Sequence, residues 1–413
     1  MTRTLDVYLE QQLVGHLVQD DGEQMLFSYD SAWLGKSNSY AISRSLPLRV
    51  EPFKQKECKG FFGGILPEEG NRKVVARVLQ ISDKNDFAML ERIGGECAGA
   101  LTFVPEGESP PEPDVEYREL NDAELTEILE ILPKRPLLAG EKGVRLSLAG
   151  EQDKIAVRVD ADGKISLPLN YAPRTHILKP AIATWEGNVS NETYCMALAS
   201  AVGLNAAPTS AHKLGDIEYL LSKRYDRSVD EDGTIHRLHQ EDFCQAMGVP
   251  SEIKYQAEGG PGLQDCLVML RLASSNIVSD IRDLLSAAIF NLLVGNNDAH
   301  AKNYAILYRQ DGKGRLAPVY DVVSTVYYPE IESKLAMKIG GQANSDLVSP
   351  KDIEVFAQED SLGAALARRN VVELAELVRT KVGEIEQPNE TANKVATLIA
   401  GRCESLLLRF KKS

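Results

Sequence analysis

The sequence predicts an α+β fold in which strand-rich segments come first and helical segments follow. Short runs of alternating apolar and polar residues, separated by glycine turns, occupy residues 1–107. Further alternating runs at 144–148, 155–159 and 175–179 continue the strand pattern. From residue 279 the apolar residues change to the i, i+3, i+4 spacing of an amphipathic helix. The chain has 413 residues, which is enough for two or three domains.

Composition and turn residues divide the chain into four segments. We predict a β-rich N-terminal domain at 1–107, an acidic, Pro-rich linker with a helix at 108–135, a second strand-rich lobe at 136–237 and a helical lobe at 238–413. In the linker segment, Asn121 and Glu124 form a capping pair for a helix over residues 122–132. In the helical lobe, apolar periodicity predicts helices over 279–294, 371–385 and 392–408.

Charge and hydrophobicity exclude several classes of protein. The formal net charge is −14, so the surface as a whole would repel nucleic acid rather than bind it. The sequence has no run of about 18 apolar residues, and its start lacks the apolar core of a signal peptide. The six cysteines are scattered without metal-ligand spacing, as is typical of small buried side chains in a reducing compartment. We therefore expect a cytoplasmic protein with no membrane span.

Two aspartates and an asparagine near residue 300 have the spacing of a phosphoryl-transfer site. Asn303 lies five residues after Asp298, and Asp321 follows after a strand–turn–strand stretch over residues 304–320. In such a site one carboxylate accepts the proton of the acceptor hydroxyl, while an amide and a second carboxylate hold the Mg²⁺ ion of ATP. The alternative is that the stretch from Asn296 to Asp298 is only a helix C-cap and loop.

The remaining parts of an ATP site lie upstream in the order that a kinase requires. A tight loop between two predicted strands can turn its backbone N–H groups toward phosphate oxygens, and it consists of Ala149, Gly150, Glu151, Gln152, Asp153 and Lys154. Lys179 ends the third strand, where a lysine would pair with the α- and β-phosphates; alternatively it is a surface lysine on an edge strand. These features predict a bilobal protein-kinase-like fold, with a β-rich nucleotide lobe and an all-helical C-lobe preceded by a small β-rich N-terminal domain. The G-x-G-x-x-G, H-R-D and D-F-G motifs are missing, so the sequence does not describe an ordinary eukaryotic-type protein kinase.

Seven short segments, in this order, resemble one family over nearly the whole chain. They are Ser147–Lys154, Asn191–Glu192 with Cys195–Met196 and Leu198–Ala199, Arg224–Arg227, His239–Asp242 with Cys244–Gln245, Lys254–Tyr255 with Gly259–Gly262, Asp298–Asn303 and Lys334–Met337. In these segments the sequence resembles the HipA-type serine/threonine kinases, which are toxin components of bacterial toxin–antitoxin modules.

The resemblance implies a role for each matching residue. Asp298 would be the proton acceptor, Asn303 and Asp321 the Mg²⁺ ligands, Lys179 the ATP lysine, residues 149–154 the phosphate-binding loop, and Lys223, Arg224 and Tyr225 the residues that contact adenine. Ser147 matches a serine that such kinases phosphorylate on themselves, which ejects the phosphate loop and silences the enzyme. A phosphoserine adds up to two negative charges and would be repelled from a phosphate-binding pocket. The alternative for Ser147 is a strand serine whose hydroxyl is bonded to the backbone.

Three further residues have two interpretations each. His300 either donates a hydrogen bond to the transferring phosphate or supports the loop, and Lys302 either binds that phosphate or points to solvent. Glu192 opens a helix predicted over residues 191–202 with Ser190 as its cap. It is a candidate for the Lys–Glu ion pair of active kinases, or else a first-turn glutamate favoured by the helix dipole.

The main functional prediction is an ATP- and Mg²⁺-dependent protein serine/threonine kinase. The resemblance implies that it phosphorylates a translation component, glutamyl-tRNA synthetase, and so arrests growth. It also implies a small DNA-binding, HipB-like antitoxin as inhibitor and co-repressor; the acidic composition then predicts that affinity for operator DNA comes mainly from that partner. Two alternatives remain: a catalytically silent kinase-fold co-repressor that binds the antitoxin, and a kinase that acts on a small molecule or lipid.

Overall fold

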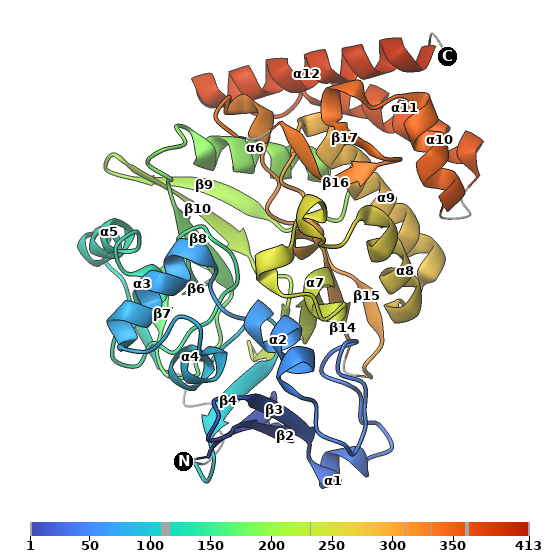
Figure 1. Cartoon of the computed structure of the whole chain (residues 1–413). Coiled ribbons are helices and arrows are strands. Elements are labelled where there is room, and N and C mark those ends of the chain that lie inside the picture. Colours follow the sequence, from blue (N-terminus) through green and yellow to red (C-terminus); the bar gives the residue numbers. More distant parts are fainter. Residues whose placement is uncertain are drawn as a thin grey trace. The chain divides into compact units, whose positions relative to one another are not determined.

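The structure is a computed structural model, and it divides the chain into two compact units (Figure 1). It describes residues 2–108, 116–231, 233–309, 311–331, 333–359 and 363–411. Unit 1 consists of Met1–Pro180, His212–Glu252 and Leu307–Gly314, and unit 2 of Ala181–Ala211, Ile253–Ile306 and Arg315–Ser413. The segments predicted as N-terminal domain and nucleotide lobe thus fall mainly in unit 1, and most of the predicted helical lobe falls in unit 2.

The first sheet of unit 1 is antiparallel and has the strand order β3-β2-β1-β4. Its strands are β1 (Arg3–Leu9), β2 (Gln12–Gln19), β3 (Met25–Tyr29) and β4 (Leu101–Pro105). Burial alternates along β3, because successive side chains of a strand point to opposite faces. The helices of this region are α1 (Ser31–Leu34), α2 (Gln55–Gly64), α3 (Glu69–Leu79) and α4 (Asp86–Ile93).

The second sheet of unit 1 has six strands in the order β5-β7-β6-β8-β10-β9. They are β5 (Tyr117–Glu119), β6 (Ile155–Val159), β7 (Ile165–Pro168), β8 (His176–Pro180), β9 (Thr209–Leu214) and β10 (Ile217–Lys223). Helix α5 (Asp122–Ile131) has the predicted capping box: the Asn121 side chain accepts from the Glu124 N–H at 3.0 Å, and the Glu124 side chain accepts from the Asn121 N–H at 2.9 Å. The short 3₁₀ helix η1 spans Pro136–Leu138.

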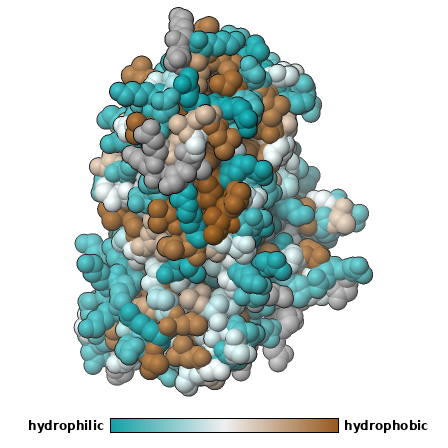
Figure 2. Space-filling model, turned by 90° about the vertical axis from the view of Figure 1, so that its right-hand side faces the viewer, coloured by the Kyte–Doolittle hydropathy of each residue, from teal (hydrophilic) through white to brown (hydrophobic). Residues whose placement is uncertain are grey.

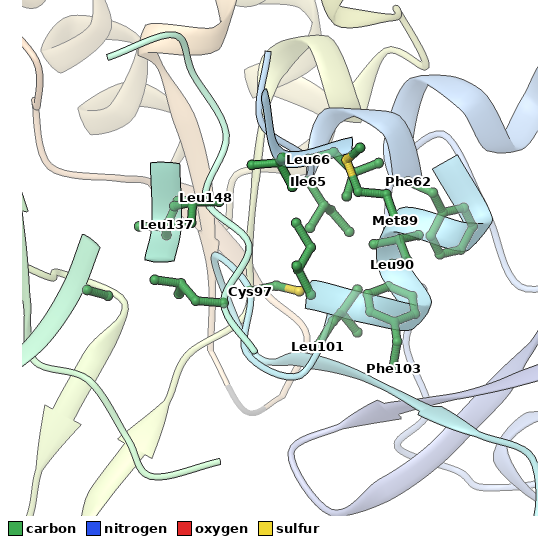
Figure 3. Packing of buried hydrophobic residues seen from close by; sticks show 14 of the residues in the cluster. Phe62, Ile65, Leu66, Met89, Leu90, Cys97, Leu101, Phe103, Leu137 and Leu148 are labelled. Atoms are coloured by element: carbon green, nitrogen blue, oxygen red, sulfur yellow. The ribbon is translucent and has the colours of Figure 1, made fainter. Parts of the chain in front are cut away.

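One hydrophobic core joins the N-terminal sheet, its helices and the six-stranded sheet. Figure 3 shows Phe62, Met89, Leu90 and Phe103 packed together, and it places Leu137 and Leu148 in the same cluster. Leu148 directly precedes the predicted phosphate loop, so this core fixes one end of that loop in unit 1. Three short strands and a helical turn complete the regular elements of unit 1: β11 (Arg227–Val229), β12 (Ile235–Arg237), β13 (Gln240–Asp242) and α7 (Phe243–Ala246).

Unit 2 is mainly helical, as predicted. Its helices are α6 (Asn188–Ala201), α8 (Leu263–Ala273), α9 (Ile277–Val294), α10 (Pro350–Glu359), α11 (Ala364–Lys381) and α12 (Glu390–Lys411). Strands β16 (Lys334–Ile339) and β17 (Gln342–Asn344) form a two-stranded antiparallel sheet. The 3₁₀ turns are η2 (Ser251–Ile253), η3 (Gln256–Glu258), η4 (Ala301–Asn303), η5 (Thr325–Tyr327) and η6 (Ser345–Leu347). Strands β14 (Ala305–Tyr308) and β15 (Gly314–Leu316) form the hairpin predicted after Asn303.

Two local predictions were wrong. Residues 144–148 are not a strand; they make isolated bridges from Val144 to Asn170 and from Leu146 to Glu96. Their alternating pattern reflects burial on one side rather than pairing in a continuous ladder. Ser190 does not cap α6, because the helix begins earlier, after Gly187. Residues 109–115 of the predicted linker lie outside the described part of the chain.

The surface and the cysteines agree with the composition. Figure 2 shows one face with extensive hydrophilic areas and smaller groups of apolar atoms. All six cysteines are free and buried, and burial raises the pKa of the Cys58, Cys97, Cys195 and Cys403 thiols to about 12. Within the described ranges, no helix combines the length and the apolar character needed to cross a bilayer.

Candidate active site

The loop that carries Asp298 begins at the end of a buried helix in unit 2. Helix α9 ends at Gly295, which has the left-handed conformation of a C-cap (φ 73°). A Cβ atom at this position would lie 2.3 Å from Val326 Cγ2, so the site has no room for a side chain. The carbonyl of Gly295 accepts from the N–H of Val326 at 3.2 Å and from Thr325 Oγ1 at 3.1 Å. The glycine therefore turns the chain out of the helix and fixes it against the segment that follows Asp321.

Two buried asparagines hold the loop from both sides. The Asn296 side chain donates to Asn291 Oδ1 at 2.9 Å, and its Oδ1 accepts from the N–H of Asp298 at 3.2 Å. The N–H of Asn297 donates to Thr325 Oγ1 at 2.8 Å, and its carbonyl accepts from the N–H of Ala336 at 2.7 Å. The helix cap and loop expected as an alternative are thus present, and they place Asp298 at a position fixed by buried hydrogen bonds.

The Asp298 side chain is half-buried and hydrogen-bonded to a tyrosine. The hydroxyl of Tyr255 donates to Asp298 Oδ1 at 3.0 Å. The ring of His300 meets the Tyr255 ring edge-on, with 5.4 Å between the ring centres. His300 and Lys302 are both buried. From the sequence, Lys254–Tyr255 is only a segment of the family resemblance and has no predicted role in the site.

The hairpin between Asn303 and Asp321 brings residues next to both of them into contact. Ala317 N–H donates to the Ala305 carbonyl at 2.9 Å, which closes the hairpin. The Tyr320 hydroxyl donates to the Lys302 carbonyl at 2.6 Å. The neighbours in sequence of Asp321 and Asn303 are therefore in direct contact, as the strand–turn–strand pattern predicted.

Asp321 has a backbone conformation that is costly for a residue with a side chain. Its φ is 59°, in the left-handed region, and its side chain is exposed. Such strain costs about 1–3 kcal/mol and is concentrated at functional sites. An exposed carboxylate and an amide oxygen are the kinds of ligand that suit Mg²⁺, which prefers oxygen and completes its shell with water and substrate phosphates. Asn303 and Asp321 could therefore hold the ion.

Helix α6 fixes the chain just after Asp321. The buried Asn191 side chain donates to the Ser324 carbonyl at 3.1 Å and accepts from the Ser324 N–H at 2.9 Å. These two hydrogen bonds take the place of backbone pairing and satisfy both the backbone N–H and the backbone carbonyl of Ser324. Glu192, the next residue, is buried as well, so an exposed first-turn glutamate is excluded. Its pairing with Lys179 stays a prediction.

The predicted phosphate loop lies in unit 1 and is attached to α3 and the residues before it. The Glu68 N–H donates to the Gly150 carbonyl at 3.3 Å, and Asn71 Nδ2 donates to the Glu151 carbonyl at 2.7 Å. Within the loop, Lys154 Nζ donates to the Ala149 carbonyl at 2.6 Å. Gly150 has a φ of 103°, which favours glycine. Gln152 is half-buried, and burial raises the pKa of the Asp153 carboxyl while a hydrogen bond from Asn71 opposes the rise.

Ser147 is completely buried next to this loop. Its hydroxyl donates to the Ile65 carbonyl at 2.9 Å, and its N–H donates to the Glu96 carbonyl at 2.9 Å. This is the backbone-satisfied serine of the alternative interpretation. Phosphorylation at this hydroxyl would require the segment to leave its site.

The predicted nucleotide residues of β8 and β10 lie in unit 1. Lys179 lies on β8 opposite Leu220, and its side chain is 6% exposed, so it is not the surface lysine of the alternative interpretation. Lys223 ends β10 and is exposed. The Tyr225 hydroxyl donates to Gln240 Oε1. The predicted proton acceptor Asp298 and both predicted Mg²⁺ ligands belong to unit 2, so their convergence with Lys179 stays a prediction.

Arg224 is part of a buried ionic cluster. Its guanidinium donates to both carboxylate oxygens of Asp226 at 2.8 and 2.9 Å and to Glu96 Oε1 at 3.2 Å. Burial alone would raise the pKa of Glu96, but Arg224, Arg227 and Arg174 lower it to about 2. Because the guanidinium is committed to these carboxylates, an adenine contact of Arg224 would have to come from its backbone.

Two protein-family models match this chain. The family described as the HipA-like C-terminal domain matches residues 146–387, and the HipA N-terminal domain matches residues 5–104. The first match covers more than half of the chain. The chain belongs to the HipA family. The protein is thus a HipA-family serine/threonine kinase, which confirms the predicted family, fold class and enzyme class, and kinase activity implies ATP as a substrate.

Relatives match nearly the full length of this HipA-family chain. It is 44% identical over 417 residues to the putative kinase Y4mE of Sinorhizobium fredii, covering 98% of this chain and 99% of that protein. It is 28% identical over 432 residues to the serine/threonine-protein kinase toxin HipA of Shewanella oneidensis, covering 98% and 96%. A solved Shewanella oneidensis toxin–antitoxin complex of HipA, HipB and operator DNA contains a chain with a TM-score of 0.87 and 26% identity, covering 99% of this chain and 98% of that one.

Proposed function

We propose that this HipA-family kinase transfers the γ-phosphate of ATP to serine hydroxyls of proteins and acts as the toxin of a toxin–antitoxin module. The observation that carries the proposal is the arrangement in unit 2. The loop of Asp298 is fixed by buried asparagines, and the Tyr320 hydroxyl donates to the Lys302 carbonyl, which joins the residue before Asp321 to the residue before Asn303. This arrangement supplies one carboxylate for the acceptor and two oxygen ligands for the metal.

In the proposed mechanism, each group has one task. Asp298 orients the serine hydroxyl and accepts its proton as the oxygen attacks the γ-phosphorus; the bond from that phosphorus to the bridging oxygen breaks, and ADP leaves with the electron pair. A bound Mg²⁺ ion would neutralise charge on the phosphates. Asn303 and Asp321 would hold that ion, while Lys179 and the loop 149–154 would hold the phosphates. Most of the acceleration would come from positioning and charge neutralisation.

The remaining ATP contacts follow the family pattern. Lys223, Arg224 and Tyr225 would contact adenine, Arg224 through its backbone because its side chain is committed to Glu96 and Asp226. His300 and Lys302 would lie beside the transferring phosphate. Both side chains are buried, which excludes the alternative that Lys302 points to solvent.

We further propose Ser147 as the site of autophosphorylation. Its hydroxyl is buried against the Ile65 carbonyl, so the phosphate loop must leave before the hydroxyl can react. Once phosphorylated, the residue could not return to this fully buried position, because phosphate oxygens carry up to two negative charges and would face the Ile65 carbonyl oxygen in place of the donating hydroxyl. Silencing of the kinase would follow from the same geometry.

The proposed partner is a HipB-like DNA-binding antitoxin, as in the Shewanella complex. With a net charge of −14, this chain would contribute little to DNA affinity, so binding to operator DNA would come mainly through that partner. The proposed protein substrate is glutamyl-tRNA synthetase, and its phosphorylation would arrest growth.

One experiment tests the transfer reaction. The purified chain is incubated with labelled ATP and Mg²⁺, with and without glutamyl-tRNA synthetase, and phosphoserine is mapped by mass spectrometry. We expect label on Ser147 and on the synthetase from wild type and from Asp311→Asn, which alters an exposed turn aspartate, but none from Asp298→Asn. ATP binding without transfer to either protein would refute the kinase mechanism and support a silent co-repressor. Label on Ser147 alone would refute only the choice of substrate.

A further inference from the structure

The segment from Lys254 to Gly262 forms a compact turn in unit 2. Tyr255 begins the 3₁₀ turn η3, and its carbonyl accepts from the N–H of Glu258 at 3.0 Å and from that of Gly260 at 2.9 Å. A Cβ atom on Gly260 would lie 2.2 Å from the Ile253 carbonyl oxygen and 2.8 Å from that of Tyr255. Only glycine lets the turn close this tightly, so the glycines after Tyr255 fix its backbone.

The same turn is bonded to the strand that braces the loop of Asp298. The Gln256 side-chain oxygen accepts from the N–H of Lys338 on β16 at 2.7 Å. Two residues earlier on β16, Ala336 N–H donates to the Asn297 carbonyl. The turn, β16 and the loop of Asp298 are therefore tied together by two hydrogen bonds that backbone N–H groups of β16 donate, one to the Gln256 side chain and one to the Asn297 carbonyl, so the backbone of Tyr255 is held in place.

From this backbone the Tyr255 side chain reaches the site. Its hydroxyl donates to Asp298 Oδ1 at 3.0 Å, and its ring lies edge-on to His300. Lys254 Nζ lies 5.3 Å from the centre of the same ring. A hydrogen bond to Oδ1 restrains the rotation of the carboxylate and so the direction from which it can meet an acceptor hydroxyl.

We propose that Tyr255 is a positioning residue that orients the carboxylate of Asp298 for phosphoryl transfer. The inference rests on the proposed role of Asp298 and extends it. Tyr255 does not touch the reacting atoms; it acts by holding one oxygen of the carboxylate. Loss of its hydroxyl should therefore slow the chemical step and leave ATP binding unchanged.

The test compares two Tyr→Phe variants of the full chain. Tyr255→Phe removes the bond to Asp298, and Tyr194→Phe removes a comparable buried bond, from the Tyr194 hydroxyl to the Val382 carbonyl at 2.6 Å. The readout is the initial rate of phosphate incorporation into the chain as a function of ATP concentration, together with the thermal unfolding midpoint. Hydrogen bonds to charged groups and base orientation predict a roughly tenfold fall in kcat for Tyr255→Phe, with KM for ATP within about twofold of wild type.

Each result decides between the possibilities. Tyr194→Phe should keep the wild-type kcat even where its unfolding midpoint falls. The inference is overturned if Tyr255→Phe keeps kcat within about twofold of wild type, or if both variants lose kcat equally; in either case the active wild type leaves the proposed function intact. A wild type that incorporates no phosphate would refute the proposed function, and this inference with it.

Discussion

Glu241 is a buried carboxyl in unit 1 whose titration should make folding pH-dependent near neutrality. It accepts from Ser43 Oγ at 2.5 Å, from the N–H of Arg44 at 3.0 Å and from the Tyr308 hydroxyl at 2.5 Å. Burial is the largest influence and raises the pKa of this carboxyl from 4.5 to about 7; the nearby Asp242 also raises it, and the three hydrogen bonds oppose the rise. The interaction joins the loop after β3 to β13 and β14.

The sign of the effect follows from the two pKa values. The folded state keeps its proton up to about pH 7, whereas the unfolded chain loses it near 4.5, so folding is favoured below pH 4.5 and loses this contribution as pH rises through 7. The rise of the Glu241 pKa from 4.5 to about 7 corresponds to a stabilisation of the folded state by about 3 kcal/mol, at about 1.36 kcal/mol for each pH unit. Between pH 5 and pH 8 the change is about 2–3 kcal/mol.

Glu241→Gln removes the titrating carboxyl, so the difference between variant and wild type reports the effect of its titration on folding. We expect the free energy of unfolding of the variant, minus that of wild type, to rise by about 2–3 kcal/mol from pH 5 to pH 8. Urea unfolding in a Trp185→Phe background leaves Trp33, buried in unit 1, as the only tryptophan probe. Glu130→Gln, at an exposed glutamate on α5, is the matched control and should show no such slope. A constant difference for Glu241→Gln across this pH range would refute the reasoning.

Three further substitutions test other parts of the two units. Glu96→Gln should lower the free energy of unfolding by about 3–5 kcal/mol at pH 7, as measured by urea unfolding, because it leaves buried arginines without their carboxylate. This difference from wild type should shrink as pH falls from 4.5 toward 2, because the Glu96 carboxylate of the wild type is protonated there as well. Asn191→Ala should cost about 2 kcal/mol through the unsatisfied groups of Ser324, as seen in thermal unfolding, and a change below about 0.5 kcal/mol would contradict the contact. Asn71→Asp keeps the size of the side chain but loses the N–H group that donates to the Glu151 carbonyl. Protease cleavage within the phosphate loop should therefore be faster in this variant than in Lys73→Ala, a control at an exposed residue of the same helix. Equal cleavage rates would show that this hydrogen bond does not hold the loop.

The parts of the fold that the sequence predicted are those that local physics determines. Helix α9 could be predicted because its apolar residues recur at i, i+3, i+4 spacing and Gly295 ends it. The hairpin between Asn303 and Asp321 could be predicted because its turn residues lie between two apolar runs. That the chain segments carrying these two residues approach each other in space then follows, since a closed hairpin returns the chain close to where it began.

The parts that could not be predicted depend on partners far along the chain. Residues 144–148 alternate like a strand, but their bridges go to Glu96 and Asn170, which no local pattern identifies. The guanidinium of Arg224 binds a carboxylate 128 residues away, and a sequence gives no sign that such an arginine is buried. Tyr255 could have been suspected only from the glycines that follow it, because a glycine-rich turn indicates a backbone that needs close packing.

Two of the segments that carry the family resemblance make buried contacts within unit 1. Arg224 and Arg227 bind Glu96 from the N-terminal part of the chain, and Glu241 binds Ser43 and Arg44 from the same part. Both interactions are buried, so their polar groups would be left unsatisfied if the N-terminal part separated. We therefore expect this part to unfold together with the six-stranded sheet.

That coupling also bears on the phosphate loop. The Glu96 backbone accepts from Ser147 N–H, while its side chain anchors the arginines, so one residue connects the ionic cluster to the autophosphorylation candidate. If the cluster holds Glu96 in place, its disruption should free Ser147 along with the loop. Glu96→Gln should then raise the rate of Ser147 phosphorylation at temperatures where the chain remains folded, measured by mass spectrometry against Glu130→Gln. An unchanged rate in a folded, destabilised Glu96→Gln variant would show that the cluster supports the fold without controlling release of the loop.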